Sequence, residues 1–364
     1  MENSVERLPF PAELMTERLL VWYREQGRDL PWRISRDPYR IWLSEVMLQQ
    51  TTVAAVIEYY HRFLKRFPSV QTLAVAEPEE VLTFWAGLGY YSRARNLHKA
   101  AQQVVAVYNG EFPQSVELLQ QLPGIGRSTA GAIVCLAFDR PEPILDGNVR
   151  RVLCRLLAVQ EPARDRKVEQ RLWGVAKLLV PVTFAHDYTQ AIMDLGATVC
   201  RPKQPDCLHC PLIEMCLAKK HDLTAVVPVA SKSKKVPTRR QAILLIEADG
   251  KKLIRRRKSE GLLGGMLEFP TVDLWAGAPS EPEVRELLVG YGCSDSPENI
   301  GSIRHSYSHF KLEADVYTHR CRVDTIQADL DLFWHPDVDL DHSALHGAHK
   351  KALALSRAKE KGKT

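Results

Sequence analysis

The segment Leu122–Val149 combines a glycine-containing turn with an isolated carboxylate, and both features suit chemistry on a nucleic acid. Its first part, LPGIGRSTA, contains Gly124 and Gly126 in a turn that opens a helical pattern. Backbone amides at a helix N-terminus bind anions such as phosphate, and we expect both glycines to permit positive φ there. Further along, LDGNV contains Asp146. Each feature alone has a plainer interpretation, namely a helix break and an ordinary Asp-Gly turn.

Four of the eight cysteines form a cluster with the spacing C-x6-C-x2-C-x5-C. In a reducing compartment such a cluster indicates metal binding rather than disulfides. Zinc and an iron–sulfur cluster both use four thiolates, and the single CxxC pair with uneven spacing favours 4Fe–4S. The candidate ligands are Cys200, Cys207, Cys210 and Cys216. The other cysteines should be buried as small apolar residues: Cys135, Cys154, Cys293 and Cys321.

Cations flank this cluster. Arg201 and Lys203 lie between the first two cysteines, and Lys219, Lys220 and His221 follow the last one. A rigid loop with such side chains could contact phosphates. An ordinary solvated loop is the alternative.

The elements that must position these residues are helices. Apolar residues recur with a 3.6-residue period from about residue 12 to residue 221. Asp37 followed by Pro38 predicts a helix start, and Ser115 and Ser128 are further candidate caps. The predicted helices are Leu14–Gln26, Arg40–Gln50, Val53–Phe67, Pro78–Ala86, Leu97–Tyr108, Ser115–Leu122, Ser128–Ala137, Asn148–Leu157, Val168–Leu179 and Tyr188–Leu195.

After Val227 the sequence changes character. We expect a helical catalytic region over 8–226, a basic linker over 227–238 and an α+β domain over 239–355. AILLIEADGKKLIRRRK has the Asp-Gly turn of a hairpin. Glu281–Gly290 has a helical pattern, and the C-terminal tail reads as helical before it frays. Alternating apolar residues predict a half-buried strand over Phe310–Val316.

Composition places few limits on function. The net charge of +5 and a pI of about 8.7 permit a polyanionic partner without requiring one. No apolar run is long enough to span a bilayer, and the N-terminus lacks the pattern of a signal peptide. We therefore expect no membrane association and a cytoplasmic protein.

Together, LPGIGRSTA, LDGNV and the cysteine spacing resemble the DNA glycosylase superfamily that includes endonuclease III. SEVMLQQT and GLGYYSRARNLH resemble more closely its MutY-type adenine DNA glycosylases. The resemblance implies an all-α helix-hairpin-helix domain with one 4Fe–4S cluster and a monovalent cation at the hairpin turn. It also implies removal of adenine paired with 8-oxoguanine or guanine in double-stranded DNA. We expect a monomer.

The chemistry can also be argued from the residues. Glycoside cleavage uses two carboxyl groups. Apolar neighbours on both sides of Glu45 should raise its pKa and suit it to a general acid, and by family analogy it protonates N7 of adenine. Asp146 would stay ionised and stabilise the cationic sugar, and Asn148 would orient it. Ser128 stands where bifunctional relatives have a nucleophilic lysine, so we expect base removal without strand cleavage.

Base flipping requires side chains that fill the gap in the duplex. By resemblance, Gln50 and Tyr90 match the wedge and intercalating residues, and Arg28, Arg33 and Gln190 match the adenine pocket. The further DNA contacts expected from the matched motifs are Thr51, Leu122, Gly124, Gly126 and Ser128.

GLLGGMLEFP and HSYSHF resemble the Nudix-like domain of the same family. Metal-dependent Nudix hydrolases need paired glutamates at the end of R-E-U-x-E-E, where this chain has Val289 and Gly290. Metal binding should therefore be poor, and we expect a domain that recognises 8-oxoguanine. The expected contacts are Tyr307, Ser308 and His309, with tyrosine in place of the usual phenylalanine.

Three other functions fit parts of the sequence. An endonuclease III-like lyase is disfavoured by Ser128 and by the additional C-terminal domain. A DNA-binding protein without catalysis is disfavoured by Glu45 and Asp146. A nucleotide pyrophosphatase is disfavoured by Val289 and Gly290.

Overall fold

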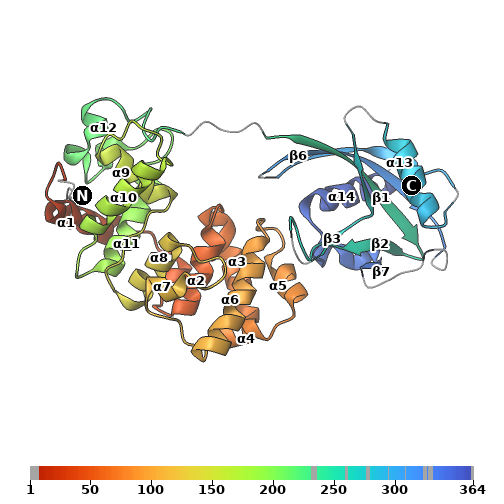
Figure 1. The fold of residues 1–364 in the computed structure, drawn as a ribbon, viewed down its shortest axis with the longest axis horizontal. Coiled ribbons are helices and arrows are strands. Elements are labelled where there is room, and N and C mark those ends of the chain that lie inside the picture. The colour runs from red at the N-terminus through yellow and green to blue at the C-terminus, as the bar shows by residue number, and fades with distance from the viewer. Residues whose placement is uncertain are drawn as a thin grey trace. The chain divides into compact units, whose positions relative to one another are not determined.

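The computed structural model describes residues 8–230, 236–258, 261–275, 279–293, 295–307, 309–322, 326 and 331–361. Its contacts divide the chain into two compact units: Met1–Val75 with Asn96–Ser233, and Ala76–Arg95 with Lys234–Thr364. The first unit is helical and the second contains a β-sheet (Figure 1). An all-α region followed by an α+β region is therefore confirmed, although Ala76–Arg95 groups with the second unit. In the described ranges, no helix is long and apolar enough to cross a membrane.

The helices of the first unit agree closely with the predicted ones. Between α2 and α3 the chain turns at Gln50, and short 3-10 turns occur at Pro31–Arg33 and in the cysteine loop. The bounds are α1 (Ala12–Gln26), α2 (Pro38–Leu48), α3 (Val53–Arg66), α4 (Val70–Ala74), α6 (Ser92–Tyr108), α7 (Val116–Leu119), α8 (Arg127–Phe138), α9 (Gly147–Leu156), α10 (Arg166–Leu179), α11 (Ala185–Asp194) and α12 (Leu217–Lys220).

Two of the three predicted helix caps are confirmed. Asp37 accepts a hydrogen bond from the Tyr39 amide at the start of α2, and Ser115 accepts one from Leu118 at the start of α7. The prediction for Ser128 is wrong, because the N-cap of α8 is Gly126, two residues earlier. The Ser128 hydroxyl instead accepts from the Leu145 amide at 3.0 Å, which ties α8 to the strand-like segment before α9.

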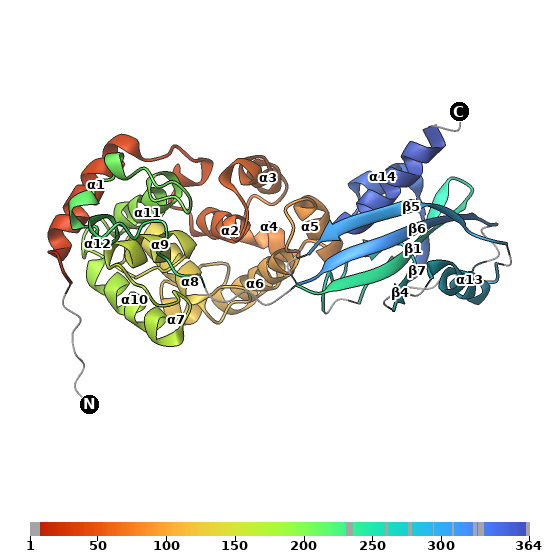
Figure 2. The ribbon, with the colours of Figure 1, turned by 90° about the horizontal axis from the view of Figure 1, so that it is seen from above.

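The second unit is a mixed seven-stranded sheet with helices on both faces (Figure 2). Its strand order is β3-β2-β1-β6-β5, with β4 paired to β1 and β7 to β2. The predicted hairpin is confirmed as β1–β2. The bounds are α5 (Pro78–Trp85), β1 (Thr238–Ala248), β2 (Lys251–Arg256), β3 (Leu267–Glu268), β4 (Thr271–Leu274), α13 (Ser280–Gly290), β5 (Glu298–Ser306), β6 (Lys311–Arg320), β7 (Leu332–Pro336) and α14 (Gly347–Lys361).

Strand β1 shows why this sheet needs two layers of helices. Its successive side chains point to opposite faces, and both faces are apolar. Ile243 and Leu245 join a core that includes α14, whereas Leu244 and Ile246 join a core that includes α13. The expected burial of lone cysteines is correct for Cys135, Cys154 and Cys293. It is wrong for Cys321, which is half-buried because it directly follows the end of β6.

Candidate active site

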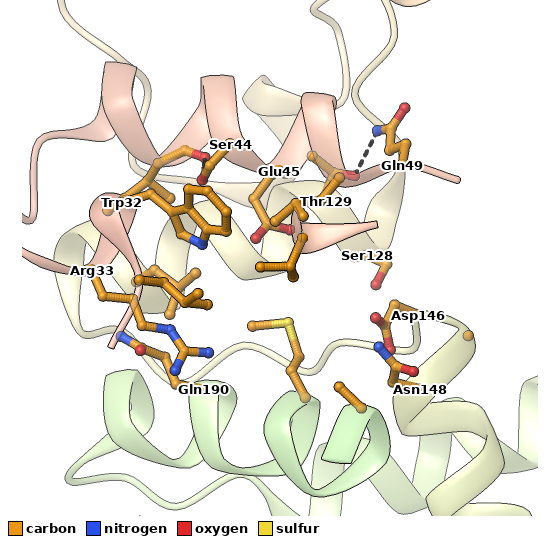
Figure 3. A pocket seen from close by; sticks show the side chains of 18 of the residues that line it. Trp32, Arg33, Ser44, Glu45, Gln49, Ser128, Thr129, Asp146, Asn148 and Gln190 are labelled. Atoms are coloured by element: carbon orange, nitrogen blue, oxygen red, sulfur yellow. Dashed lines mark hydrogen bonds between the residues drawn. The ribbon is translucent and has the colours of Figure 1, made fainter. Parts of the chain in front are cut away.

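A cavity of about 520 Å³ lies in the first unit, between α2, the start of α8, the start of α9 and α11 (Figure 3). This volume is typical of a small-ligand site. The walls contain most of the residues that the sequence analysis proposed: Arg28, Arg33, Glu45, Gln50, Thr51, Ser128, Asp146, Asn148 and Gln190.

Glu45 projects into the cavity from α2, which is anchored by fully buried neighbours such as Trp42 and Met47. Burial, together with the negative charge of Asp146, raises the pKa of Glu45 from 4.5 to about 7, although the charge of Arg33 opposes this increase. A carboxyl group with this pKa holds its proton near neutral pH and can give it up, as a general acid must. The predicted pKa increase is confirmed.

Asp146 is the N-cap of α9, and its Oδ1 accepts a hydrogen bond of 2.7 Å from the Val149 amide. Burial raises its pKa, whereas the amides of Val149 and Asn148 and the cations Arg151 and Arg150 oppose the shift. The positive end of the helix dipole also favours a carboxylate here. Asp146 is therefore a helix cap, and its catalytic role stays a prediction.

Asn148 is held firmly beside Asp146. Its Oδ1 accepts a hydrogen bond of 2.7 Å from Arg151, which also donates to the Gly196 carbonyl. A Cβ on Gly196 would come within 2.6 Å of the Asn148 Cβ, so only glycine permits this approach. The side-chain amide of Asn148 thus has a defined orientation in the cavity wall.

The two predicted pocket arginines share one buried carboxylate, which the sequence analysis missed. Asp194 accepts hydrogen bonds from the side chains of Arg28 and Arg33 at 2.6–2.8 Å, and its side chain is fully buried. These donors lower the pKa of Asp194. Such an arrangement fixes both guanidinium groups in the wall of the cavity.

Gln190 lies in a hydrogen-bonded row that the sequence analysis also missed. Tyr23 donates to its Oε1 at 2.7 Å, and its Nε2 lies 2.9 Å from His186 Nε2. His186 Nδ1 in turn lies 2.8 Å from Asp187. A signal existed in the sequence: His186, Gln190 and Asp194 recur every four residues on α11, which places them on one helix face.

The hairpin turn joins α7 and α8, as predicted, but its two glycines differ. Gly124 has φ of +80°, and a Cβ there would lie 2.8 Å from Asn96. Gly126 has φ of −85°, so the expectation of positive φ is wrong for it, because it serves as the N-cap of α8. The Leu122 side chain is buried and its carbonyl accepts from Ile125, so direct contact by that side chain is not available.

Gln50 is exposed at the end of α2 with φ of +59°, next to Thr51, and both line the cavity. Tyr90, in the second unit, has φ of +50° and is 41% exposed. A non-glycine residue in the left-handed region costs free energy and is frequent at functional positions. Both residues combine a positive φ with an exposed side chain, and their entry into a duplex stays a prediction.

The four clustered cysteines lie around one loop, where burial chiefly, and the neighbouring cysteines to a lesser extent, raise the pKa values of Cys210 and Cys216. Arg155 approaches the Cys200 sulfur at 3.3 Å and also donates to the carbonyls of Arg201 and Pro202. A single tetrahedral zinc would hold thiolate sulfurs about 3.8 Å apart. Among the described residues, the cysteines do not form a group with ligand atoms within 4.8 Å of one another. The 4Fe–4S cluster stays a prediction from the sequence.

In the second unit, Tyr307 packs against the core beside α14. Its hydroxyl, which the usual phenylalanine lacks, pairs with His346 Nδ1 at 3.1 Å. His346, Glu268 and His349 bring possible ligand atoms within 4.8 Å of one another. The Phe269 amide, however, donates to His349 Nδ1, so its other nitrogen carries a proton and is a poor metal ligand. His309 is exposed, and Ser308 lies outside the described residues.

Comparison with known proteins agrees with this arrangement. Residues 43–177 match the family of HhH-GPD superfamily base excision DNA repair proteins, and residues 241–355 match the NUDIX domain. Adenine DNA glycosylase of Mus musculus is 38% identical over 82% of this chain and 69% of its own length. The enzyme of Buchnera aphidicola from Schizaphis graminum is 35% identical over 82% of this chain and 85% of its own.

Two solved structures resemble the helical part. A thermostable thymine-DNA glycosylase has a TM-score of 0.53 and 28% identity, covering 58% of this chain and 97% of its own. Endonuclease III in a non-covalent DNA complex has a TM-score of 0.50 and 25% identity, covering 59% and 99%. With two carboxyl groups in one cavity, a helix-hairpin-helix turn and a Nudix-like second domain, the chain belongs to the MutY-type adenine DNA glycosylases of base excision repair.

Proposed function

We propose that this adenine DNA glycosylase acts on adenine paired with 8-oxoguanine or guanine in double-stranded DNA and leaves an abasic site. The observation that supports this most directly is the cavity that contains both Glu45, with a pKa of about 7, and Asp146 at a helix N-terminus. One group can donate a proton while the other carries negative charge, as cleavage of a glycosidic bond needs.

In the proposed reaction, Glu45 protonates the flipped adenine at N7, which makes the base a better leaving group. As the bond to the sugar breaks, positive charge develops on the sugar, and the Asp146 carboxylate stabilises it electrostatically or through a transient covalent bond. Asn148, oriented by Arg151, holds Asp146 or the sugar in place. The base leaves with the proton from Glu45. Water then bonds to the sugar carbon, displacing Asp146 where a covalent bond has formed, and its proton passes to Glu45, which restores the acid.

We propose a monofunctional enzyme because the cavity lacks a suitable amine. Among the described residues that line it, none is a lysine, and Ser128 occupies the position of the nucleophile in bifunctional relatives. A hydroxyl that accepts a hydrogen bond from the Leu145 amide cannot form a Schiff base with the sugar. Strand cleavage should therefore require alkali or heat.

We assign recognition of 8-oxoguanine to the Nudix-like domain, which we place at 239–355 after a linker at 227–238, with Tyr307, Ser308 and His309 as the contacts. Val289 is 69% exposed on α13 beside Gly290, where a metal-dependent hydrolase has glutamates. This difference supports recognition rather than phosphate hydrolysis.

We propose that Cys200, Cys207, Cys210 and Cys216 hold one 4Fe–4S cluster, which would give the loop a fixed shape. The cations beside them, including Lys219 and Lys220, are exposed and would contact DNA phosphates.

The hairpin amides around Gly124 and Gly126 would bind a further phosphate, with a monovalent cation at the turn. The related endonuclease III structure is a DNA complex, which supports this surface. We expect a monomer.

Excision assays on end-labelled duplexes test the proposal. The substrates carry adenine opposite 8-oxoguanine, guanine or thymine, and each reaction is divided and analysed with and without alkali. We expect product opposite 8-oxoguanine and guanine, visible as strand breaks only after alkali. Equal breakage without alkali would contradict the monofunctional assignment. Absence of product in every duplex would leave only a binding function.

A further inference from the structure

Tyr23, Gln190, His186 and Asp187 form a series of hydrogen bonds. The chemistry of Asp187 fixes which atom donates and which accepts in each of them. A carboxylate only accepts hydrogen bonds, so neutral His186 must carry its proton on Nδ1, which faces Asp187 at 2.8 Å. His186 Nε2 is then an acceptor and must face the amide nitrogen of Gln190, at 2.9 Å. The amide oxygen is left on the other side, where the Tyr23 hydroxyl donates to it at 2.7 Å.

Turning the Gln190 amide over would break the hydrogen bond to His186, whereas the Tyr23 hydroxyl could still accept one from the amide nitrogen. The amide oxygen would then face an imidazole nitrogen without a proton, and two acceptors would oppose each other. The Gln190 side chain is buried, so no bulk water could replace the lost hydrogen bond. A carboxylate outside the base-binding site thus sets the orientation of an amide within its wall.

We propose that Asp187 and His186 are positioning residues that hold Gln190 in one amide orientation and thereby select adenine over 6-oxopurines. This inference rests on the proposed function, since it assumes that Gln190 faces the flipped base. An amide has two donor protons and two acceptor lone pairs, and the row uses one of each. One proton and one lone pair are left for the substrate.

The donor proton and the acceptor lone pair that Gln190 has left match the hydrogen-bonding groups of adenine. If Glu45 protonates N7, Gln190 meets the neighbouring edge, where adenine offers a donor at its 6-amino group and an acceptor at N1. A glutamine amide can bind such a donor–acceptor pair with two hydrogen bonds. Hypoxanthine and guanine reverse this pattern, with an acceptor at O6 and a donor at N1. Only the opposite orientation of the amide would bind them.

The test compares release of adenine and hypoxanthine from duplexes that are otherwise identical, each opposite 8-oxoguanine, under single-turnover conditions. Asp187→Asn keeps the size of the side chain, but the asparagine amide can donate to His186 Nδ1. The variant therefore permits the His186 tautomer with its proton on Nε2. A similar change in a Ser-His-Asp triad leaves the geometry intact while altering the tautomer. We expect the adenine-to-hypoxanthine rate ratio to fall by about tenfold in this variant, because the amide can turn. The matched control is Asp165→Asn. Asp165 caps α10 and does not line the cavity, so this variant should keep the wild-type ratio of adenine to hypoxanthine release.

A second measurement does not depend on activity. Nitrogen-15 NMR of His186 should show the Nδ1–H tautomer in the wild-type protein and a mixture in Asp187→Asn. Observation of the Nε2–H tautomer in the wild type would overturn the inference without any variant.

The activity results separate the two proposals. A wild-type enzyme that releases no adenine opposite 8-oxoguanine contradicts the proposed function. A wild-type enzyme that releases adenine, with a ratio unchanged in Asp187→Asn, contradicts only the role of the His186–Asp187 pair. A variant in which both rates fall equally would show that Asp187 supports the fold without setting specificity.

Discussion

Replacing Glu45 with glutamine should stabilise the protein while it removes activity, and the gain should depend on pH. In the folded state the pKa of Glu45 is about 7, compared with 4.5 for the same group in an unfolded chain. The folded state therefore binds the proton more tightly. Stability falls as pH rises above 4.5, and the full cost is present above about 7. Glutamine has the same shape and never ionises, so Glu45→Gln avoids this cost.

The magnitude follows from the two pKa values. With about 1.36 kcal/mol for each pKa unit, the ionisation of Glu45 costs about 0.8 kcal/mol at pH 5 and about 3.3 kcal/mol at pH 8. The variant should therefore gain about 2.5 kcal/mol more stability at pH 8 than at pH 5. Water in the cavity screens the charge, so this difference is an upper bound.

The assay is urea unfolding of the wild type and of Glu45→Gln at pH 5 and pH 8, followed by far-UV circular dichroism, which is dominated by the helical unit. Glu58→Gln on α3, which does not line the cavity, is the control and should show no such pH-dependent gain. An equal change in stability at both pH values for Glu45→Gln would refute the argument, because it would mean that Glu45 ionises normally in the folded protein.

Four further predictions follow from the same geometry. Excision by the wild type should fall as pH rises through about 7, because Glu45 loses its proton, and a rate that stays flat to pH 9 would argue against it as the acid. Asp194→Asn leaves the partly buried Arg28 and Arg33 without a counter-charge and should lower the free energy of unfolding by about 3 kcal/mol, measured by urea titration. Ser128→Lys places an amine in the cavity, so borohydride should trap a covalent complex with DNA, whereas the wild type should give none. Cys216→Ser should lose bound iron and the brown colour, measured by metal analysis and visible absorption; zinc in the wild type would contradict the cluster assignment.

Much of the fold could be predicted because its helices and strands have regular apolar patterns. The errors arose where a single residue had two possible local roles. Ser128 resembles a cap in sequence, but the N-cap is Gly126, and the Ser128 hydroxyl accepts a hydrogen bond from Leu145, before α9. Gly126 resembles a residue that needs positive φ, but an N-cap has extended backbone. Local sequence cannot distinguish such roles, because the deciding partner is distant in the chain.

The candidate site shows the same division. Glu45 and Asp146 could be identified because each lies in a distinctive motif, and their types alone suggest an acid and a carboxylate for glycoside cleavage. Asp194 and Tyr23 could not, because no motif marks them and their partners Arg33 and Gln190 are more than 160 residues away.

The sequence by itself therefore determined the family, the pair of carboxyl groups and the absence of a lysine at position 128, since these depend on residue type and spacing. Only the tertiary structure decided how these groups behave. It raised the pKa of Glu45 through burial, paired Arg33 with Asp194, and brought Tyr23 of α1 to the Gln190 amide of α11. The physical reason is that pKa values and hydrogen-bond directions depend on neighbours in space, which packing brings together from separate helices.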